Sequence, residues 1–196
     1  MKQKLNWLLL LLIFQAPLAH SIELLGLISY DGSAYAKKPS NYVSSGGGIG
    51  YGFAGRLELG PGLIESGFRY TATSVTTSEL FGNVKTTGSF WIIPLLYRVY
   101  VVPPFLSLAI GPDYAILSNT QIELNSSSLG GNYSSGYRSH FGLEASAEAL
   151  QDLGENLSAV LDVRYRYGLA DTINLDGTGL RYQAYIISIG IQKRLE

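Results

Sequence analysis

Apolar and polar side chains alternate one by one along most of the chain beyond residue 21. In the segment 104–117, Leu106, Leu108 and Ile110 share one parity, whereas the residues between them are small or polar. Successive side chains of a strand point to opposite faces, so this period of two predicts strands with one apolar face. Eight segments show the pattern: 22–31, 42–59, 62–73, 86–100, 104–117, 137–150, 156–169 and 181–195.

The connections between these segments alternate in length. The short ones cover 60–61, 101–103 and 151–155, and the long ones, rich in Gly, Ser, Thr and Asn, cover 32–41, 74–85, 118–136 and 170–180. An even number of strands joined alternately by short turns and long loops is typical of outer-membrane barrels. The pattern therefore predicts an all-β, eight-stranded antiparallel up-and-down transmembrane β-barrel that forms a single domain over 22–196.

The first 21 residues are organised like a secretory signal peptide. Lys2 and Lys4 form a basic start, and an unbroken apolar run covers 7–14. Small residues, Ala19 and Ser21, precede the expected cleavage point. The apolar run is too short for a membrane-spanning helix, which needs about 20 residues. We therefore expect residues 1–21 to be cleaved after export and residues 22–196 to form the barrel domain.

Charged residues indicate which face of the strands points inwards. They stand opposite the apolar stripe, and acids and bases are equally numerous among them. An isolated charge is costly in a low-dielectric interior, but paired charges offset one another, and an eight-stranded barrel has just enough room for side chains. We therefore predict a lumen filled by an ion-pair network of Arg56, Glu58, Glu65, Arg69, Arg98, Asp113, Glu144, Glu148, Asp162, Arg164, Arg166 and Arg194.

Aromatic side chains of the apolar face are predicted to gather at two levels. The larger group lies near the long-loop ends of the strands: Tyr30, Tyr70, Trp91, Tyr114, Phe141, Tyr165, Tyr167 and Tyr185. A smaller group, Phe53 and Tyr97, is expected toward the other rim. Two such levels are typical of the aromatic girdles at the two interfaces of a membrane barrel. The alternative is a soluble barrel with its charged face in water, whose apolar core would need no such banding.

The amino-acid composition excludes several classes of function. The chain of 196 residues has a formal net charge of −1, without the basic excess of a nucleic-acid-binding protein. It contains no cysteine, which excludes disulfides, thiolate metal sites and a cysteine nucleophile. Of its two histidines one lies in the leader, which leaves His140. We therefore expect no metal, no cofactor and no nucleic-acid partner.

Five runs within the predicted strands carry a resemblance to a known family: 93–98, 106–112, 141–143, 162–169 and 187–192. They resemble the outer-membrane β-barrel domain superfamily of Gram-negative bacteria, the small eight-stranded barrels similar to OmpA and OmpX. The resemblance covers the whole of 22–196. It implies residence in the bacterial outer membrane, contact with lipid including lipopolysaccharide, and biogenesis through periplasmic chaperones and the barrel-assembly machinery.

Two segments are candidates for sites of chemistry. Some barrels that this chain resembles modify lipid A with a serine or histidine near the outer rim, where Ser139 and His140 fall. Adjacent residues of a strand point to opposite faces, and Glu144 lies about 13 Å along the strand from His140, so a triad would need partners from other strands. The glycine-rich run 46–52 lacks the strand–helix context of a nucleotide-binding loop and instead predicts sharp curvature or close packing.

The leading hypothesis for function is a structural or surface-interaction role, exerted through four external loops that could bind an extracellular ligand. A narrow pore for small solutes is the first alternative, because a wide aqueous channel needs about sixteen strands or more. A lipid A-modifying enzyme of the outer membrane is the second alternative.

Overall fold

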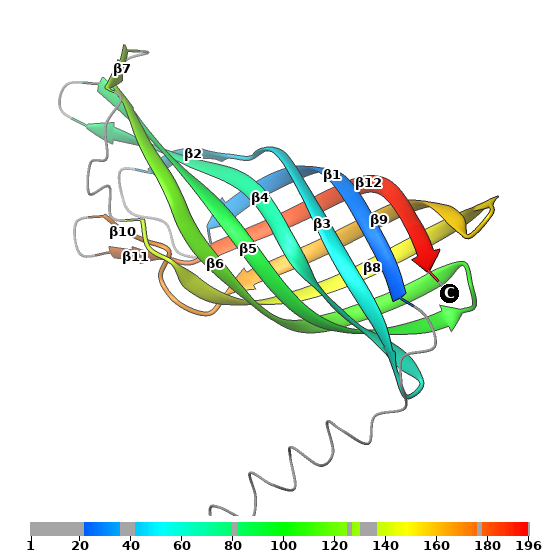
Figure 1. Cartoon of the computed structure of the whole chain (residues 1–196). Coiled ribbons are helices and arrows are strands. Elements are labelled where there is room, and N and C mark those ends of the chain that lie inside the picture. The colour runs from blue at the N-terminus through cyan, green and yellow to red at the C-terminus, as the bar shows by residue number, and fades with distance from the viewer. Residues whose placement is uncertain are drawn as a thin grey trace, which may run out of the picture.

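The computed structural model describes residues 22–35, 42–79, 82–124, 127–129, 137–175 and 178–195. Eight long strands form a closed barrel (Figure 1): β1 (Ile22–Tyr35), β3 (Gly48–Leu59), β4 (Gly62–Glu79), β5 (Gly82–Val102), β6 (Leu106–Leu124), β8 (His140–Gly154), β9 (Leu157–Gly168) and β12 (Tyr182–Leu195). Shorter strands in the described residues are β2 (Tyr42–Gly46), β7 (Ser127–Leu129), β10 (Ile173–Leu175) and β11 (Thr178–Leu180). Among the described residues, no helix is long and apolar enough to span a membrane.

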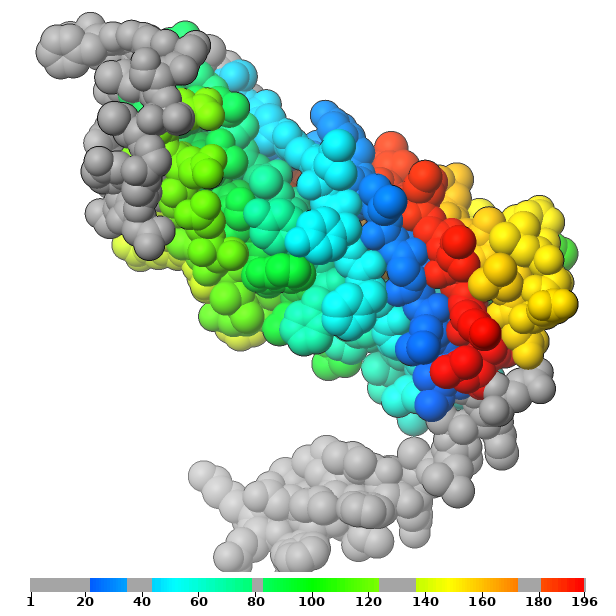
Figure 2. Space-filling model, turned by 45° about the horizontal axis from the view of Figure 1, so that its top comes forward, coloured from blue at the N-terminus to red at the C-terminus, as the bar shows by residue number. Residues whose placement is uncertain are grey.

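The barrel closes by pairing its first long strand with its last. All neighbouring strands are antiparallel, and β1 pairs with β12 along its whole length, from Ile22 opposite Leu195 to Tyr35 opposite Tyr182. Figure 2 shows β1 in blue and β12 in red side by side on the outer wall. Within the barrel wall each of the eight strands is paired on both sides, which removes the usual route to edge-to-edge aggregation there. The predicted fold class, an eight-stranded antiparallel barrel, is confirmed.

The strands are staggered around the barrel. A path that passes from each Cα atom to its partner on the next strand can be followed once around the barrel. It starts at Glu58 on β3 and returns to β3 at Gly48, ten residues away. A stagger of this kind accompanies a strand tilt of about 35–45°, and the strands in Figure 1 run diagonally across the wall. Each residue therefore adds about 2.5 Å of height along the barrel axis.

The two rims of the barrel differ. At one rim, which we call the short-turn rim, tight turns join β3 to β4, β5 to β6 and β8 to β9. The turn after β8 uses left-handed backbone at Gly154, Glu155 and Asn156, with φ of 89°, 53° and 63°. The opposite end, the long-loop rim, carries the connections that sequence predicts to be long.

Several strands extend into segments that the sequence pattern predicts as connections. β1 continues to Tyr35 and β8 to Gly154. The largest extensions are in β4, β5 and β6: the pattern predicts a loop over 74–85, but β4 continues to Glu79 and β5 begins at Gly82, and β6 continues through 118–124. Threonine and valine fit strands well, so the Ser/Thr-rich composition that suggested loops also sustains a ladder. In Figure 1 these three strands project beyond the long-loop rim. The predicted signal peptide, 1–21, lies outside the described residues.

Candidate functional site: the charged lumen and its outer wall

The barrel wall carries apolar side chains outside and charged side chains inside. On the outer face Ile28, Ile110 and Ile189 are 62%, 66% and 63% exposed. Inside, the guanidinium-bearing side chains of Arg56 and Arg98 are completely buried. The buried residues from the predicted network are Arg56, Glu65, Arg69, Arg98, Asp113, Glu144, Glu148, Asp162, Arg164 and Arg166.

Two residues predicted for the network, Glu58 and Arg194, are exposed instead. Each is the second-last residue of its strand, at the short-turn rim. The lumen opens at this rim, so a side chain on the inward face is exposed there. Arg194 pairs there with Glu23 at 2.8 Å. Sequence reasoning missed Glu23 and Asp31, which are 1% and 0% exposed, because the apolar residues of 22–31 occupy both faces of β1 and hide its parity.

Glu65 is the centre of the lower part of the network. Its carboxylate accepts hydrogen bonds from Arg56 Nε at 2.8 Å, Arg98 Nε at 3.0 Å and an Arg164 terminal nitrogen at 2.8 Å. These arginines come from β3, β5 and β9, so one carboxylate on β4 joins strands from different sides of the barrel. Arg56 also donates to both oxygens of Glu148 on β8. The contacts therefore cross the lumen rather than line it.

Arg164 joins this lower part to an upper part centred on Glu144. Glu144 accepts two hydrogen bonds from Arg69, at 3.1 and 2.8 Å, and one from Arg164 at 2.8 Å. Arg164 Nε donates to Asp162, two residues before it on the same inward face, at 2.7 Å. Planar guanidinium groups suit such multiple contacts, because each offers five donors in a fixed fork.

His140 lies at the top of the network, facing inwards. Arg166 donates to Asp113 at 2.9 Å and to His140 Nε2 at 2.9 Å, and its guanidinium lies 5.3 Å from the centre of the Tyr182 ring. A guanidinium can only donate, so Nε2 accepts and Nδ1 carries the proton that bonds the Arg138 carbonyl at 3.0 Å. The hydrogen-bond pattern therefore assigns a single neutral tautomer to this histidine.

The residues considered for enzymatic chemistry are held apart. Ser139 is exposed on the outer side, and its hydroxyl oxygen accepts a hydrogen bond from the Leu117 backbone N–H at 3.0 Å. His140 is 3% exposed and points into the lumen, where its ring nitrogens are both engaged. Glu144 bonds the arginines below it. Among the described residues, no three His, Asp or Glu side chains are arranged to hold a metal ion.

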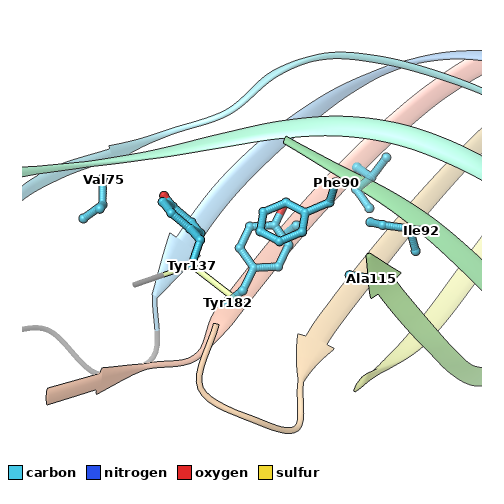
Figure 3. Close-up of a cluster of buried hydrophobic side chains, with 8 residues drawn as sticks. Val75, Phe90, Ile92, Ala115, Tyr137 and Tyr182 are labelled. Atoms are coloured by element: carbon cyan, nitrogen blue, oxygen red, sulfur yellow. The ribbon is translucent and has the colours of Figure 1, made fainter. Parts of the chain in front are cut away.

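Apolar side chains fill the parts of the lumen that the charges leave. Near the long-loop rim a cluster gathers from β4, β5, β6, β12 and residue 137, and Figure 3 shows the rings of Phe90, Tyr137 and Tyr182 within it. Phe90 and Tyr137 lie 5.8 Å apart, and Tyr137 donates to the Thr86 carbonyl at 3.2 Å. A second cluster, nearer the short-turn rim, contains Leu25, Leu27, Ala54, Leu150 and Val160.

The network stabilises one arrangement of strands more than it stabilises folding. Taking charges out of water costs several kcal/mol per ion, which the ion pairs approximately repay when their geometry is good. Losing one partner is far more costly, because a buried charge is then left without compensation. Any other register of the strands would separate these partners, so the network favours this register over the alternatives.

The outer wall carries an aromatic level near the long-loop rim. Ring centroids lie 5.2 Å apart for Tyr70 and Trp91, and 5.0 Å apart for Tyr165 and Tyr185. Tyr51, which sequence reasoning did not include, stacks on Tyr70 at 5.3 Å. All residues predicted for this level lie on the outer face: Tyr30, Tyr70, Trp91, Tyr114, Phe141, Tyr165, Tyr167 and Tyr185.

The two residues of the smaller aromatic group lie at different heights on the outer face. The Tyr97 hydroxyl donates to the carbonyl of Leu59, the last residue of β3, at 3.5 Å, so this ring extends toward the short-turn rim. Phe53 is six residues from the end of β3, which places its backbone about 15 Å above that end.

The aliphatic residues complete an apolar belt around the barrel. The outward positions of β6 run from Leu106 through Leu108, Ile110, Pro112 and Tyr114 to Ile116 without a charge. These ten residue steps correspond to about 25 Å of height. Transmembrane barrels of the outer-membrane type have an apolar band of about 25 Å.

No family model and no curated protein matches the chain. Among solved structures it is similar to the outer membrane protein OprG from Pseudomonas aeruginosa, at 12% identity and a TM-score of 0.49, covering 93% of this chain and 99% of that chain. It is also similar to Neisserial surface protein A, at 11% identity and a TM-score of 0.46, covering 88% and 96% of the two chains. A third is Ail of Yersinia pestis, at 13% identity and a TM-score of 0.45, covering 89% and 98%.

Proposed function

We propose that this chain is an integral protein of the bacterial outer membrane, which it crosses as an eight-stranded barrel with a side-chain-filled lumen. The observation that carries the proposal is the polarity of the wall. An apolar belt about 25 Å high covers the outside, while the charged side chains lie within. A soluble barrel would need the reverse arrangement, because water solvates charges and excludes large apolar surfaces.

The N-terminal segment fits this location. Residues 1–21 have the pattern of a cleaved signal peptide, which would deliver the chain to the periplasm, and β1 begins at Ile22. Periplasmic chaperones and the barrel-assembly machinery would then insert the barrel with both chain ends at the short-turn rim. The lipid around the belt would include lipopolysaccharide.

The role that we propose is structural or surface-interacting, through the segments beyond the long-loop rim. Ion pairs that cross the lumen argue against an open path, and Ser139 and His140 point to opposite sides of the wall. The segments that remain for recognition are the external connections and the projecting parts of β4, β5 and β6. These would carry an extracellular ligand site.

The membrane assignment is tested by fractionation and by heat-modifiable migration. A folded membrane barrel stays compact in detergent gels until it is boiled, so unboiled and boiled samples are expected to migrate differently, with the protein in the outer-membrane fraction. Recovery in the soluble periplasmic fraction, together with migration unchanged by boiling, would contradict the assignment.

The surface role is tested by shortening the projecting hairpin. Replacing residues 76–85 with a tight turn is expected to keep heat-modifiable migration and to reduce attachment of the expressing cells to host cells or matrix. Single-channel recordings and lipid A mass spectrometry on the unaltered protein test the pore and the enzyme. Conductance, altered lipid A, or undiminished attachment would each count against the proposed role.

A further inference from the structure

Asp31 differs from the other buried carboxylates of the lumen. Each of the others has a guanidinium within ion-pair distance, but within the described part of the chain Asp31 has none. Its side chain is 0% exposed, and only one carboxylate oxygen, Oδ2, accepts a hydrogen bond, from the Thr71 hydroxyl. The other oxygen, Oδ1, has no protein partner. A buried acceptor in this state is costly, so a further donor is expected beside it.

Three more polar atoms near Asp31 are also without a protein partner: Ser29 Oγ, Ser188 Oγ and Arg69 Nε. Ser29 and Ser188 are directly opposite each other on β1 and β12 and are 4% and 1% exposed. Opposite residues on one face have Cβ atoms about 4.5–5.5 Å apart, so their hydroxyl groups are neighbours. Asp31 follows two residues after Ser29 and therefore points to the same face.

Gly50 lies beside these groups. It is the Cα partner of Ser29 on β3, on the other side from Ser188. A Cβ atom at this position would lie 2.5 Å from Ser29 Oγ, 2.6 Å from the Tyr70 backbone oxygen and 3.7 Å from Asp31 Oδ1. Ser29 Oγ and Asp31 Oδ1 therefore both lie next to this glycine, where a larger residue would not fit without a shift of its neighbours.

Arg69 borders the same region, but most of its donors bond another residue. Its two terminal nitrogens donate to Glu144, at 3.1 and 2.8 Å. Its charge also attracts Asp31, and Nε is the one guanidinium nitrogen without a protein acceptor. The region thus contains one group that can only donate, Arg69 Nε, and one that can only accept, Asp31 Oδ1. Two hydroxyl groups beside them can donate or accept.

We propose that Arg69, Asp31, Ser29 and Ser188 form a binding site for buried water, which accepts from Arg69 Nε and donates to Asp31 Oδ1. A buried water typically makes about three hydrogen bonds, within a range of two to four, which this set supplies. The same oxygens could surround an alkali cation, but the adjacent guanidinium would repel it. Water therefore links Asp31 to the ion-pair network. This site does not depend on where in the cell the barrel resides.

The test is water–amide magnetisation transfer by NMR on the full barrel in detergent micelles. Cross-peaks at the water frequency are expected at the amides of Ser29, Asp31 and Gly50, and none at Gly26 on the outer wall. The double variant Ser29→Ala with Ser188→Ala should weaken the Gly50 cross-peak by roughly twofold or more, since water keeps only two of its partners. Asp31→Leu should abolish it by replacing the acceptor with an apolar side chain.

Three results would overturn the proposal. The first is the absence of water contacts at all three amides in the unaltered protein, which decides the matter even where a variant fails to fold. The second is a direct contact between Arg69 Nε–H and the Asp31 carboxylate. The third is a shift of the Asp31 carboxyl resonance when sodium chloride is replaced by choline chloride, which would indicate a bound cation.

Discussion

Replacing Ile110 with arginine tests the polarity of the wall directly. Ile110 is 66% exposed on the outer face of β6, four residues from Leu106 and six from Ile116. It therefore lies about 10 Å from the lower edge of the apolar belt and about 15 Å from the upper edge. An arginine on the lipid face of a barrel costs about 2–4 kcal/mol at the bilayer midplane and about 0–1 kcal/mol near an interface. Ile110→Arg should thus destabilise the barrel strongly.

The matched control is Leu106→Arg, at the lower edge of the same face. Equilibrium unfolding in urea, with the barrel inserted in phospholipid vesicles, should show Ile110→Arg to be less stable than Leu106→Arg by about 2–3 kcal/mol. If the face met water, both substitutions would change stability by no more than about 0.5 kcal/mol. Equal, small effects in the two variants would therefore refute the assignment of this face to lipid.

Two further predictions concern the lumen and are measured by the same unfolding assay. Glu65→Ala should cost about 3–5 kcal/mol, because buried guanidinium groups lose a shared acceptor. Glu123→Ala, which removes only the exposed ion pair with Lys85 at 3.4 Å, should cost less than about 1 kcal/mol. Similar losses for the two would show that the lumen is hydrated. Gly142→Ala should cost about 1–3 kcal/mol, because its Cβ would lie 2.6 Å from an Asp113 oxygen. Gly55→Ala, with open space around it, should change stability by less than about 1 kcal/mol, and an equal loss there would contradict this reasoning.

Strand parity identified most of the inward charges and failed where a local pattern was absent. In β9 the alternation of Asp162, Arg164 and Arg166 with apolar residues is unbroken, and all three are buried. In β1 apolar residues occupy both faces, because Leu25 and Leu27 fill the lumen while Ile28 faces outwards. The sequence therefore offered no local signal for the inward acids of that strand.

The prediction of loops over 74–85 and 118–124 was wrong for a related reason. Ser, Thr and Asn suit both loops and exposed strands, and their sequence pattern does not distinguish a loop from a strand paired with its neighbour. The continuation of β4 through 74–79 depends on its pairing with β5 and β2. Strand pairing is a contact between segments that are separated in sequence, so the composition of one segment does not predict it.

What the sequence determined by itself was the number of long strands, their antiparallel order and the opposite polarity of the two faces, since a period of two is a local property of the chain. Only the tertiary structure decided which charges meet. Arg56 bonds Glu148, 92 residues away, and Arg164 bonds Glu65, 99 residues away. These pairs depend on the ten-residue stagger around the barrel, which sets the level of every side chain and arises only when the last strand closes on the first.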